Sequence, residues 1–289
     1  MTQNYVLVTD NACDLSAEML SRMGIPFVSL NVFMKDAPAL PCTLSHSDFY
    51  HALRNGQVAC TSAANLSQFR ELFSQILAEG KDILYLAFSS ALSCIYATGK
   101  LAAEELQEEY PDRKIIVIDS LCASLGQGLL VYHAAQKREA GATLEELAAY
   151  ITEQRLKTVH WFTVDDLMYL KRGGRVSTAS ALAGTLLGIK PIMRVNNEGK
   201  LTVYSKVRGR KASLQMLATR YGEECTDREA PVYICQADCL ADAEYLKEML
   251  QNEYGAKHIT IEENGGVIGS HTGPGVIGLF YTADSRETG

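Results

Sequence analysis

The chain has 289 residues, enough for one large domain or two ordinary domains with their own hydrophobic cores. Its 47% hydrophobic and 21% charged residues are typical of a soluble globular protein, and no apolar run approaches the roughly 18 to 20 residues that span a bilayer. The formal net charge of −7 and the lack of a recognisable reading module argue against nucleic-acid binding. The beginning of the sequence, MTQNYVLVTD, has no basic stretch followed by a hydrophobic one, so we expect no secretory signal and a cytoplasmic location.

The eight cysteines are scattered along the sequence. They form no Cys-x-x-Cys pair, and no histidine stands where it would complete a zinc site with them. We therefore expect free thiols in a reducing compartment, no bound metal and no cofactor.

The first half of the chain alternates apolar strands with helices. We expect strands at residues 5–9, 25–33, 82–88 and 115–119, and helices after Ser16, over 48–54 and 66–78, and ending near 109 and 141. Ser47 is expected to cap the helix over 48–54, and residues 60–64 are expected to form a loop. A capping box of Thr143 and Glu146 begins the last helix of this half. The alternation predicts parallel pairing in a doubly wound α/β sheet.

The second half is less regular and predicts a smaller α/β domain with a mixed sheet. We expect strands at residues 160–164, 189–195, 201–205, 232–235 and 258–262, and helices over 209–221 and 241–254. Asn196 to Gly199 is expected to be a hairpin turn, which pairs its two flanking strands antiparallel. Because a basic segment begins soon after residue 160, we place the domain boundary just before it, giving domains of residues 1–157 and 158–289.

That basic segment contrasts with the acidic remainder of the chain. Between Lys171 and Lys211 there are ten Lys or Arg residues and a single acid, Glu198, so the segment carries +9 in a chain of −7. Such a concentration of charge attracts an anionic ligand or partner, although a solvated basic face is the simpler explanation of any single lysine.

A Gly-Gly pair lies near the start of the basic segment. Gly173 and Gly174 are expected to end a short helix over residues 165–171, because glycine tolerates the left-handed conformation at a helix end. The turn would place Arg172 and Arg175 on either side of it. Arginine forks suit the oxygens of carboxylates and phosphates.

Hydroxyl groups follow the ends of several strands in the first half. In a doubly wound fold these ends line the ligand crevice, although each Ser or Thr taken alone is more often a helix cap. The loop Ser89–Ser93 leads from a strand into a helix start, where free backbone N–H groups and the helix dipole favour an anion. Hydroxyls of Ser93 and Thr61 would complete a small oxyanion pocket. His271 lies in a loop rich in glycine and proline, and its glycine neighbours favour a ligand-binding role over a surface one.

Ser93 and His271 also permit a second hypothesis, a stand-alone serine hydrolase or acyltransferase with Ser93 as nucleophile and His271 as base. The sequence has no Gly-x-Ser-x-Gly motif, no acid obviously suited to orient His271, and no Walker loop for phosphoryl transfer. A carboxylate- or phosphate-binding site therefore fits the residues better than a catalyst. Leu182 to Ile192 mixes large aliphatic and small residues, which fits either an apolar tunnel wall or core packing.

Several motifs occur in order along nearly the whole chain. They are Val164–Ser177 (VDDLMYLKRGGRVS), Leu187–Ile192 (LGIKPI), Lys206–Lys211 (KVRGRK) and Gly269–Gly275 (GSHTGPG), together with Val8–Asp10, Thr61–Ser62, Ser89–Ser93 and Val117–Ser120. No single motif is decisive, but together and in this order they resemble those of the DegV family of bacterial lipid-binding proteins.

The resemblance implies a fatty-acid-binding protein rather than an enzyme. In that family a long-chain fatty acid lies in a closed tunnel between two α/β domains, and several members act as the binding subunit of bacterial fatty acid kinase. Such a subunit presents the carboxylate to a separate ATP-binding kinase subunit, and the product is an acyl-phosphate for phospholipid synthesis. The implied partners are therefore a long-chain fatty acid and an ATP-binding fatty acid kinase subunit.

The resemblance also assigns roles to individual residues. The residues matched to the carboxylate end of the tunnel are Thr61, Ser93 and His271, and we expect their neighbours Ser62 and Cys94 to bind the carboxylate as well. Arg172 matches a basic position near the tunnel mouth that serves the kinase step, and Arg208 and Arg210 are further candidates for docking the kinase subunit.

Two motifs depart from the family pattern. Thr61-Ser-Ala-Ala64 replaces the usual Thr-Ser-Gln-Pro, and Ala91 and Cys94 replace the glycines of Ser-Gly-Leu-Ser-Gly. Because the hydroxyls are retained, we expect the anion site to remain. The altered loops would change acyl preference or the fit of the partner.

Overall fold

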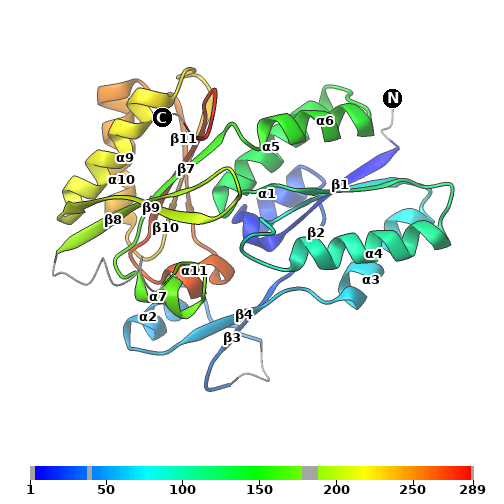
Figure 1. Ribbon diagram of the computed structural model, residues 1–289, viewed down its shortest axis with the longest axis horizontal. Helices are drawn as coiled ribbons and strands as arrows, with labels where there is room; N and C mark the ends of the chain where they lie inside the picture. Colours follow the sequence, from blue (N-terminus) through cyan, green and yellow to red (C-terminus); the bar gives the residue numbers. More distant parts are fainter. Residues whose placement is uncertain (1–3, 38–40, 178–187, 288–289) are drawn as a thin grey trace.

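The apolar strands of the first half pair in parallel, as their alternation with helices predicts (Figure 1). In the computed structural model, which describes residues 4–37, 41–177 and 188–287, their order is β2 (Phe27–Val28), β1 (Tyr5–Asp10), β5 (Asp82–Ala87) and β6 (Ile115–Asp119). The longer strands of this sheet are mostly apolar, which suits a sheet that is covered on both faces.

Helices cover both faces of this sheet, which makes it doubly wound. The helices on one face are α3 (Leu66–Ala78) and α4 (Ile95–Glu109), and those on the other are α1 (Ala17–Arg22), α5 (Leu125–Glu139) and α6 (Leu144–Gln154). Successive side chains of a strand point to opposite faces, so Leu7 of β1 packs in the cluster of α5 and α6 while Val8 packs in that of α3 and α4.

The second half forms a mixed sheet, which confirms the expected fold class. Its strand order is β11 (His258–Glu263), β10 (Pro231–Gln236), β12 (Ile277–Thr282), β7 (Thr158–Thr163), β8 (Ile189–Val195) and β9 (Leu201–Arg208). β10 and β11 pair in parallel, whereas the other neighbours pair antiparallel. α9 (Arg210–Glu224) and α10 (Leu240–Tyr254) pack against one face.

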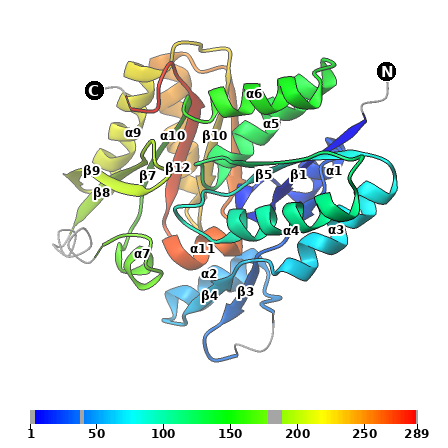
Figure 2. The ribbon, with the colours of Figure 1, turned by 45° about the vertical axis from the view of Figure 1, so that its right-hand side comes forward.

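Helix α5 lies between the two sheets and packs against both (Figures 1 and 2). All its residues from Leu125 to Val131 are buried, as expected of a helix covered on every side. Two glycines permit the close approach. A Cβ on Gly126 would lie 2.0 Å from Nε2 of His160 in β7, and one on Gly128 would lie 2.7 Å from the carbonyl oxygen of Cys13.

A further apolar cluster joins residues from both sides of the predicted domain boundary. It packs Phe49 and Leu53 of α2 (His46–Arg54) against Phe162, Leu170 and Val276. The elements that surround it are β3 (Asn31–Met34), β4 (Ala59–Ser62), α7 (Met168–Arg172) and α11 (Gly266–Thr272). The boundary before residue 158 stays a prediction, and this packing places residues 31–62 against the second half.

Three local expectations are corrected by the structure. Residues 60–62 belong to strand β4 and not to a loop, because they pair antiparallel with residues 31–33 of β3. Helix α2 begins at His46, since Oγ of Ser45, and not of Ser47, accepts the hydrogen bond from the backbone N of Asp48 (3.2 Å). The expected strand over 25–33 is divided into β2 and β3, which pair with different partners.

Candidate functional site

A cavity of about 240 Å³ lies between the two halves of the chain. The side chains that give its wall an apolar character include Leu30, Phe88, Leu92, Phe162, Leu170, Val195, Leu201, Val267, Ile268, Val276 and Phe280. The polar side chains of the wall are Thr61, Ser93, Ser124, His160, Arg175, Asn264, His271 and Thr272. Both halves contribute to each group, so the packing of one half on the other forms the cavity.

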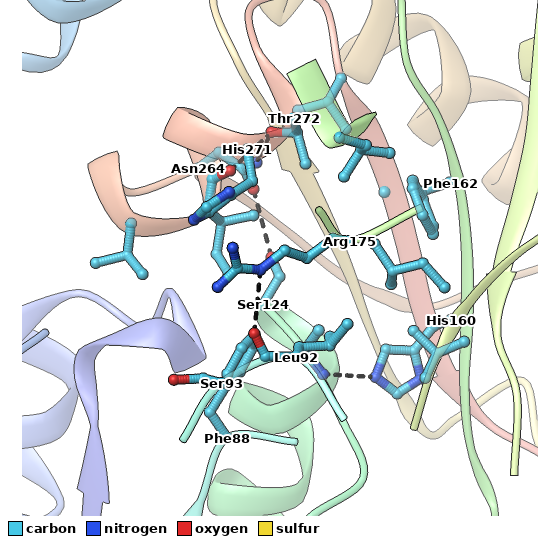
Figure 3. A pocket seen from close by; sticks show the side chains of 18 of the residues that line it. Phe88, Leu92, Ser93, Ser124, His160, Phe162, Arg175, Asn264, His271 and Thr272 are labelled. Carbon is cyan, nitrogen blue, oxygen red and sulfur yellow. Dashed lines mark hydrogen bonds between the residues drawn. The ribbon is translucent and has the colours of Figure 1, made fainter. Parts of the chain in front are cut away.

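Four elements that are distant in sequence bring polar groups to the same part of the wall. Thr61 is in β4, Ser93 immediately precedes the N-cap of α4, and His271 is in the last turn of α11. Arg175 follows the Gly173-Gly174 turn that ends α7, and its guanidinium extends between His271 and Ser93 (Figure 3). The expectation that His271 lies in a loop is therefore corrected, because residues 266–272 form a helix.

His271 is held by Thr61 and by the close approach of α7. Its Nε2 lies 2.7 Å from Oγ1 of Thr61. Its Nδ1 is buried without a hydrogen-bond partner in the described part of the chain, and a Cβ on Gly173 would lie 2.3 Å from that atom. Burial, and secondly the charge of Arg175, lowers the pKa of His271 to about 4. The imidazole is therefore neutral at pH 7.

Arg175 supplies the positive charge of the site. Its Nε donates a hydrogen bond to the carbonyl oxygen of Leu92 (3.1 Å), and its Nη1 donates to the carbonyl oxygen of Gly173. Burial lowers the pKa of Arg175, but a guanidinium remains charged in proteins. Residue 175 is thus a fixed cation beside Ser93 and the start of α4.

Ser93 faces the cavity at the amino-terminal end of a long helix. Its Oγ accepts a hydrogen bond from the backbone N of Ile95 (3.3 Å), and Cys94 is the N-cap of α4 with no side-chain hydrogen bond to the helix. The first N–H groups of such a helix and its dipole favour a negative charge. Cys94 is exposed and also lines the cavity, so the cavity reaches the surface near this point.

Ser62, which was also predicted to bind the carboxylate, lies elsewhere. Ser62 is exposed, does not line the cavity, and accepts a long hydrogen bond from Nδ2 of Asn31 (3.4 Å). Its side chain points away from that of Thr61 because consecutive residues of β4 face opposite sides of the strand. The structure therefore brings together Thr61, Ser93, Cys94 and His271, but not Ser62.

The predicted arginines are on the surface or paired with acids. Arg172 is exposed and stacks on the ring of Tyr169, with 5.3 Å from its guanidinium carbon to the ring centroid. Arg208 is exposed on β9. Arg210 forms ion pairs with Asp242 (2.8 Å) and Asp165 (3.7 Å), so its charge is already compensated within the chain.

Sequence reasoning missed several residues of the cavity wall. Arg175 was placed only beside the Gly-Gly turn, and the cluster of basic residues was the signal that could have found it. His160 is marked by no motif in the sequence. In the structure both of its nitrogens bind backbone: Nδ1 lies 3.0 Å from the carbonyl oxygen of Thr158, and Nε2 accepts from the backbone N of Ala123 (3.2 Å). Burial lowers the pKa of His160 well below its usual value.

The geometry does not support a catalytic Ser–His pair. Nε2 of His271 is engaged by Thr61, and Ser93 accepts from Ile95. Across the residues that the structure describes, no carboxylate hydrogen-bonds to Nδ1 of His271, as a catalytic triad requires. The arrangement can bind an anion through hydroxyls, a guanidinium and helix N–H groups.

Neither a metal site nor a membrane span emerges from the described residues. In residues 4–37, 41–177 and 188–287 no group of three His, Cys, Asp or Glu side chains is placed to hold a metal ion. No helix in those ranges is long and apolar enough to cross a membrane. The run from Leu182 to Ile192, which fits either an apolar tunnel wall or core packing, lies partly outside the described residues, since only residues 188–192 are described.

The chain matches known proteins over almost its full length. Residues 4–284 match the family model described as "Uncharacterised protein, DegV family". A DegV domain-containing protein of Clostridium perfringens is 41% identical in an alignment of 289 positions that covers 99% of each chain. A fatty-acid-binding DegV family protein from Thermus thermophilus superposes with a TM-score of 0.87 at 28% identity, over 97% of this chain and 100% of the other. A fatty-acid-binding DegV family protein from Streptococcus agalactiae gives 0.86 at 28% identity, over 98% and 100%. The chain therefore belongs to the DegV family.

Proposed function

We propose that this protein binds a long-chain fatty acid in the cavity between its two halves. The observation that carries the proposal is the distribution of polar groups: Thr61, Ser93, Arg175 and His271 gather at one part of a largely apolar wall. A fatty acid has the complementary distribution, with one charged group on a long apolar chain. The solved relatives that bind fatty acids support the same ligand class.

The carboxylate is held by groups of different kinds. The charge of Arg175 offsets the cost of removing a carboxylate from water, which an uncharged site would not do. We assign neutral His271 the tautomer with its proton on Nε2, 2.7 Å from Oγ1 of Thr61, so that the imidazole donates to Thr61 and the Thr61 hydroxyl proton is free for a carboxylate oxygen. Ser93 and the first N–H groups of α4 complete the set of donors.

The protein presents this carboxylate to a separate ATP-binding kinase subunit and is not itself the enzyme. A carboxylate oxygen attacks the γ-phosphorus of ATP, ADP leaves, and an acyl-phosphate forms. The chain contains no Walker loop to bind the nucleotide, and exposed Cys94 marks a place where the cavity reaches the surface. Exposed Arg172 and Arg208 are the candidates for docking the kinase subunit, whereas Arg210 is held by its two acids.

Palmitate binding tests the first step, measured by displacement of a fluorescent fatty acid. Palmitate should displace the probe from the wild-type protein at one molecule per chain. The double variant Thr61→Val/Arg175→Met should bind palmitate far more weakly, while Arg208→Met serves as a matched control on the surface. Failure of the wild-type protein to bind palmitate or oleate would remove the proposal. For the second step, an ATP-binding fatty acid kinase subunit should form acyl-phosphate only when this protein is added.

A further inference from the structure

The carboxyl group of Asp14 joins the two halves of the molecule directly behind the cavity wall. Its Oδ2 accepts a hydrogen bond from Oγ of Ser124 at the start of α5 (2.6 Å), and its Oδ1 accepts one from the backbone N of Gly265 at the start of α11 (3.0 Å). A Cβ on Gly265 would lie 2.9 Å from Oδ1, so glycine permits this approach. One side chain thus ties the first half to the first residues of α11.

The same contacts connect Asp14 with the ligand site. Ser124 and Asn264 both line the cavity, and Oγ of Ser124 lies 3.4 Å from Oδ1 of Asn264 (Figure 3). Nδ2 of Asn264 donates to Oγ1 of Thr272 (3.4 Å), which is the neighbour of His271 in the last turn of α11. Asp14 therefore fixes the beginning of the helix whose end carries His271.

We infer that Asp14 is a positioning residue for the fatty-acid site. Protonated Asp14 holds α11 against the first half, and ionised Asp14 favours local separation of α11 from the first half. The link to fatty-acid binding rests on the proposed function, because it acts through His271. Separation would release one wall of the cavity, which gives the ligand a route in or out.

A carboxylate at this place has little to offset its burial. Asp14 is 7% exposed, and no cation among the described residues forms an ion pair with it. The titratable groups that face it are Cys13 beside it in the chain, Tyr50 on α2 and Cys235 on β10. Burial raises the pKa of each of these three, so all are neutral near pH 7. Burial likewise raises the pKa of Asp14 to about 7, against the lowering effect of its two hydrogen bonds.

Protonation also extends the hydrogen bonding across the seam. When Asp14 is ionised, the single hydroxyl proton of Ser124 goes to Oδ2 of Asp14, and Oδ1 of Asn264 receives none from it. When Asp14 carries a proton on Oδ2, it donates to Oγ of Ser124, whose own proton then turns to Asn264. The protonated form therefore has one more hydrogen bond between the halves, and its formation takes up one proton from solvent.

The sign of the pH dependence follows from the two states. With α11 separated, solvent returns the pKa of Asp14 towards its usual value of 3.8, whereas in the closed state it is about 7. Between these values the closed state binds a proton that the open state does not, so closure is favoured at low pH. This advantage is lost as the pH rises through about 7, with a change in the opening constant of up to about tenfold per pH unit.

Hydrogen exchange with mass spectrometry tests the inference on the full chain without ligand. Protection of the peptide that covers residues 264–275, corrected for the intrinsic rate of exchange, is measured from pH 5 to 8. In wild type this protection should fall with rising pH and level off above about pH 7, while the protection of the β7 and β12 peptides should fall less. Asp14→Asn mimics the protonated acid and tolerates the left-handed backbone at residue 14, so its protection should be high and nearly independent of pH. Asp10→Asn is the matched control, because Asp10 is a buried acid bonded only within the first half, and it should keep the wild-type slope.

A flat wild-type profile overturns the inference even if Asp14→Asn does not fold, and so does an Asp14→Asn profile with the wild-type slope. The palmitate assay is run beside it. If palmitate binds and the exchange profile is flat, the positioning role of Asp14 is wrong and the proposed function stands. If palmitate does not bind while the profile slopes, the proposed function is wrong and the tether remains.

Discussion

Nε2 of His271 lies 2.7 Å from Oγ1 of Thr61, a residue 210 positions earlier in the chain. The contact joins the last turn of α11 to strand β4 on the wall of the cavity. It pairs a neutral imidazole with a hydroxyl, and Arg175 supplies a charge beside them. This set of groups suits an oxyanion that must be bound and not cleaved.

Removing the hydroxyl of Thr61 should weaken fatty-acid binding moderately. Thr61→Val keeps the β-branched shape of the strand residue but loses the hydroxyl that bonds to His271, so palmitate affinity should fall by about 1 kcal/mol, roughly fivefold. In a His271→Ala background the same change should cost less, because the two groups act together. Displacement titrations of both single variants and the double variant measure the coupling. Strict additivity would contradict a shared role.

Arg175 and Arg172 should behave differently although only the Gly-Gly pair separates them. Arg175→Met removes the charged donor at the cavity, which should lower palmitate affinity by about 1.5 to 3 kcal/mol. Arg172→Met changes an exposed side chain outside the wall, so palmitate binding should stay within twofold of wild type while acyl-phosphate formation with the kinase subunit falls. Equal losses of palmitate affinity in both variants would show that the guanidinium at the cavity has no special role.

A methyl group at position 173 should displace the imidazole of His271. Gly173 has an ordinary helical backbone, so Gly173→Ala adds no backbone strain, but its Cβ would lie 2.3 Å from Nδ1 of His271. Palmitate affinity should therefore fall as in His271→Ala, on the order of 1 kcal/mol. The control is the double variant: once His271 is alanine, Gly173→Ala should have no further effect. A further loss there would mean that the glycine serves something other than the imidazole.

His271 should lower the stability of the protein in acid. Its pKa is about 4 in the folded chain against the usual 6.5, so between these values the unfolded chain binds a proton that the folded chain does not. The free energy of unfolding therefore falls as the pH is lowered from about 6.5 to about 4. His271→Asn should remove this contribution, so urea unfolding at several pH values should show the variant gaining on wild type as the pH decreases. A difference that does not change with pH would contradict the lowered pKa.

Arg286 should be a major support of the packing between the halves. It is 2% exposed and donates to the carbonyl oxygens of Thr158 (2.9 Å), Leu121 (2.6 Å) and Asn196 (3.2 Å), which lie in different parts of the chain. Arg286→Met removes these hydrogen bonds together and leaves the carbonyl oxygen of Leu121 without its donor, so the free energy of unfolding should decrease by on the order of 3 kcal/mol. Arg208→Met, on the exposed surface, should change it by less than about 0.5 kcal/mol. Similar effects of the two changes would show that the buried contacts contribute little.

The sequence predicts the elements that local physics determines. Helix α3 spans residues 66–78 as expected because its apolar residues keep to one stripe, and the capping box of Thr143 and Glu146 forms. Strands β6 and β8 also have the expected bounds. Strand β12, by contrast, has no counterpart among the expected strands. It begins two residues after Gly275, beyond the last segment for which the sequence predicts a structure.

The site was predicted less completely because its geometry depends on packing between distant elements. The hydroxyls of Thr61 and Ser93 were found, but β4 is a strand only through its pairing with β3, which turns Ser62 away from the cavity. Nothing local distinguishes Arg172 from Arg175. The turn at Gly173-Gly174 decides which of the two enters the wall, and only the tertiary structure shows the result.

The most direct test of fatty-acid binding is mass spectrometry of the protein as purified, first under native conditions and then after organic extraction. We expect a stoichiometric fatty acid bound to the native chain, or full occupancy after addition of palmitate or oleate, with the mass of the extracted acid reporting the chain length that the cavity accepts. A native mass equal to the bare chain, unchanged by either added fatty acid, would contradict it.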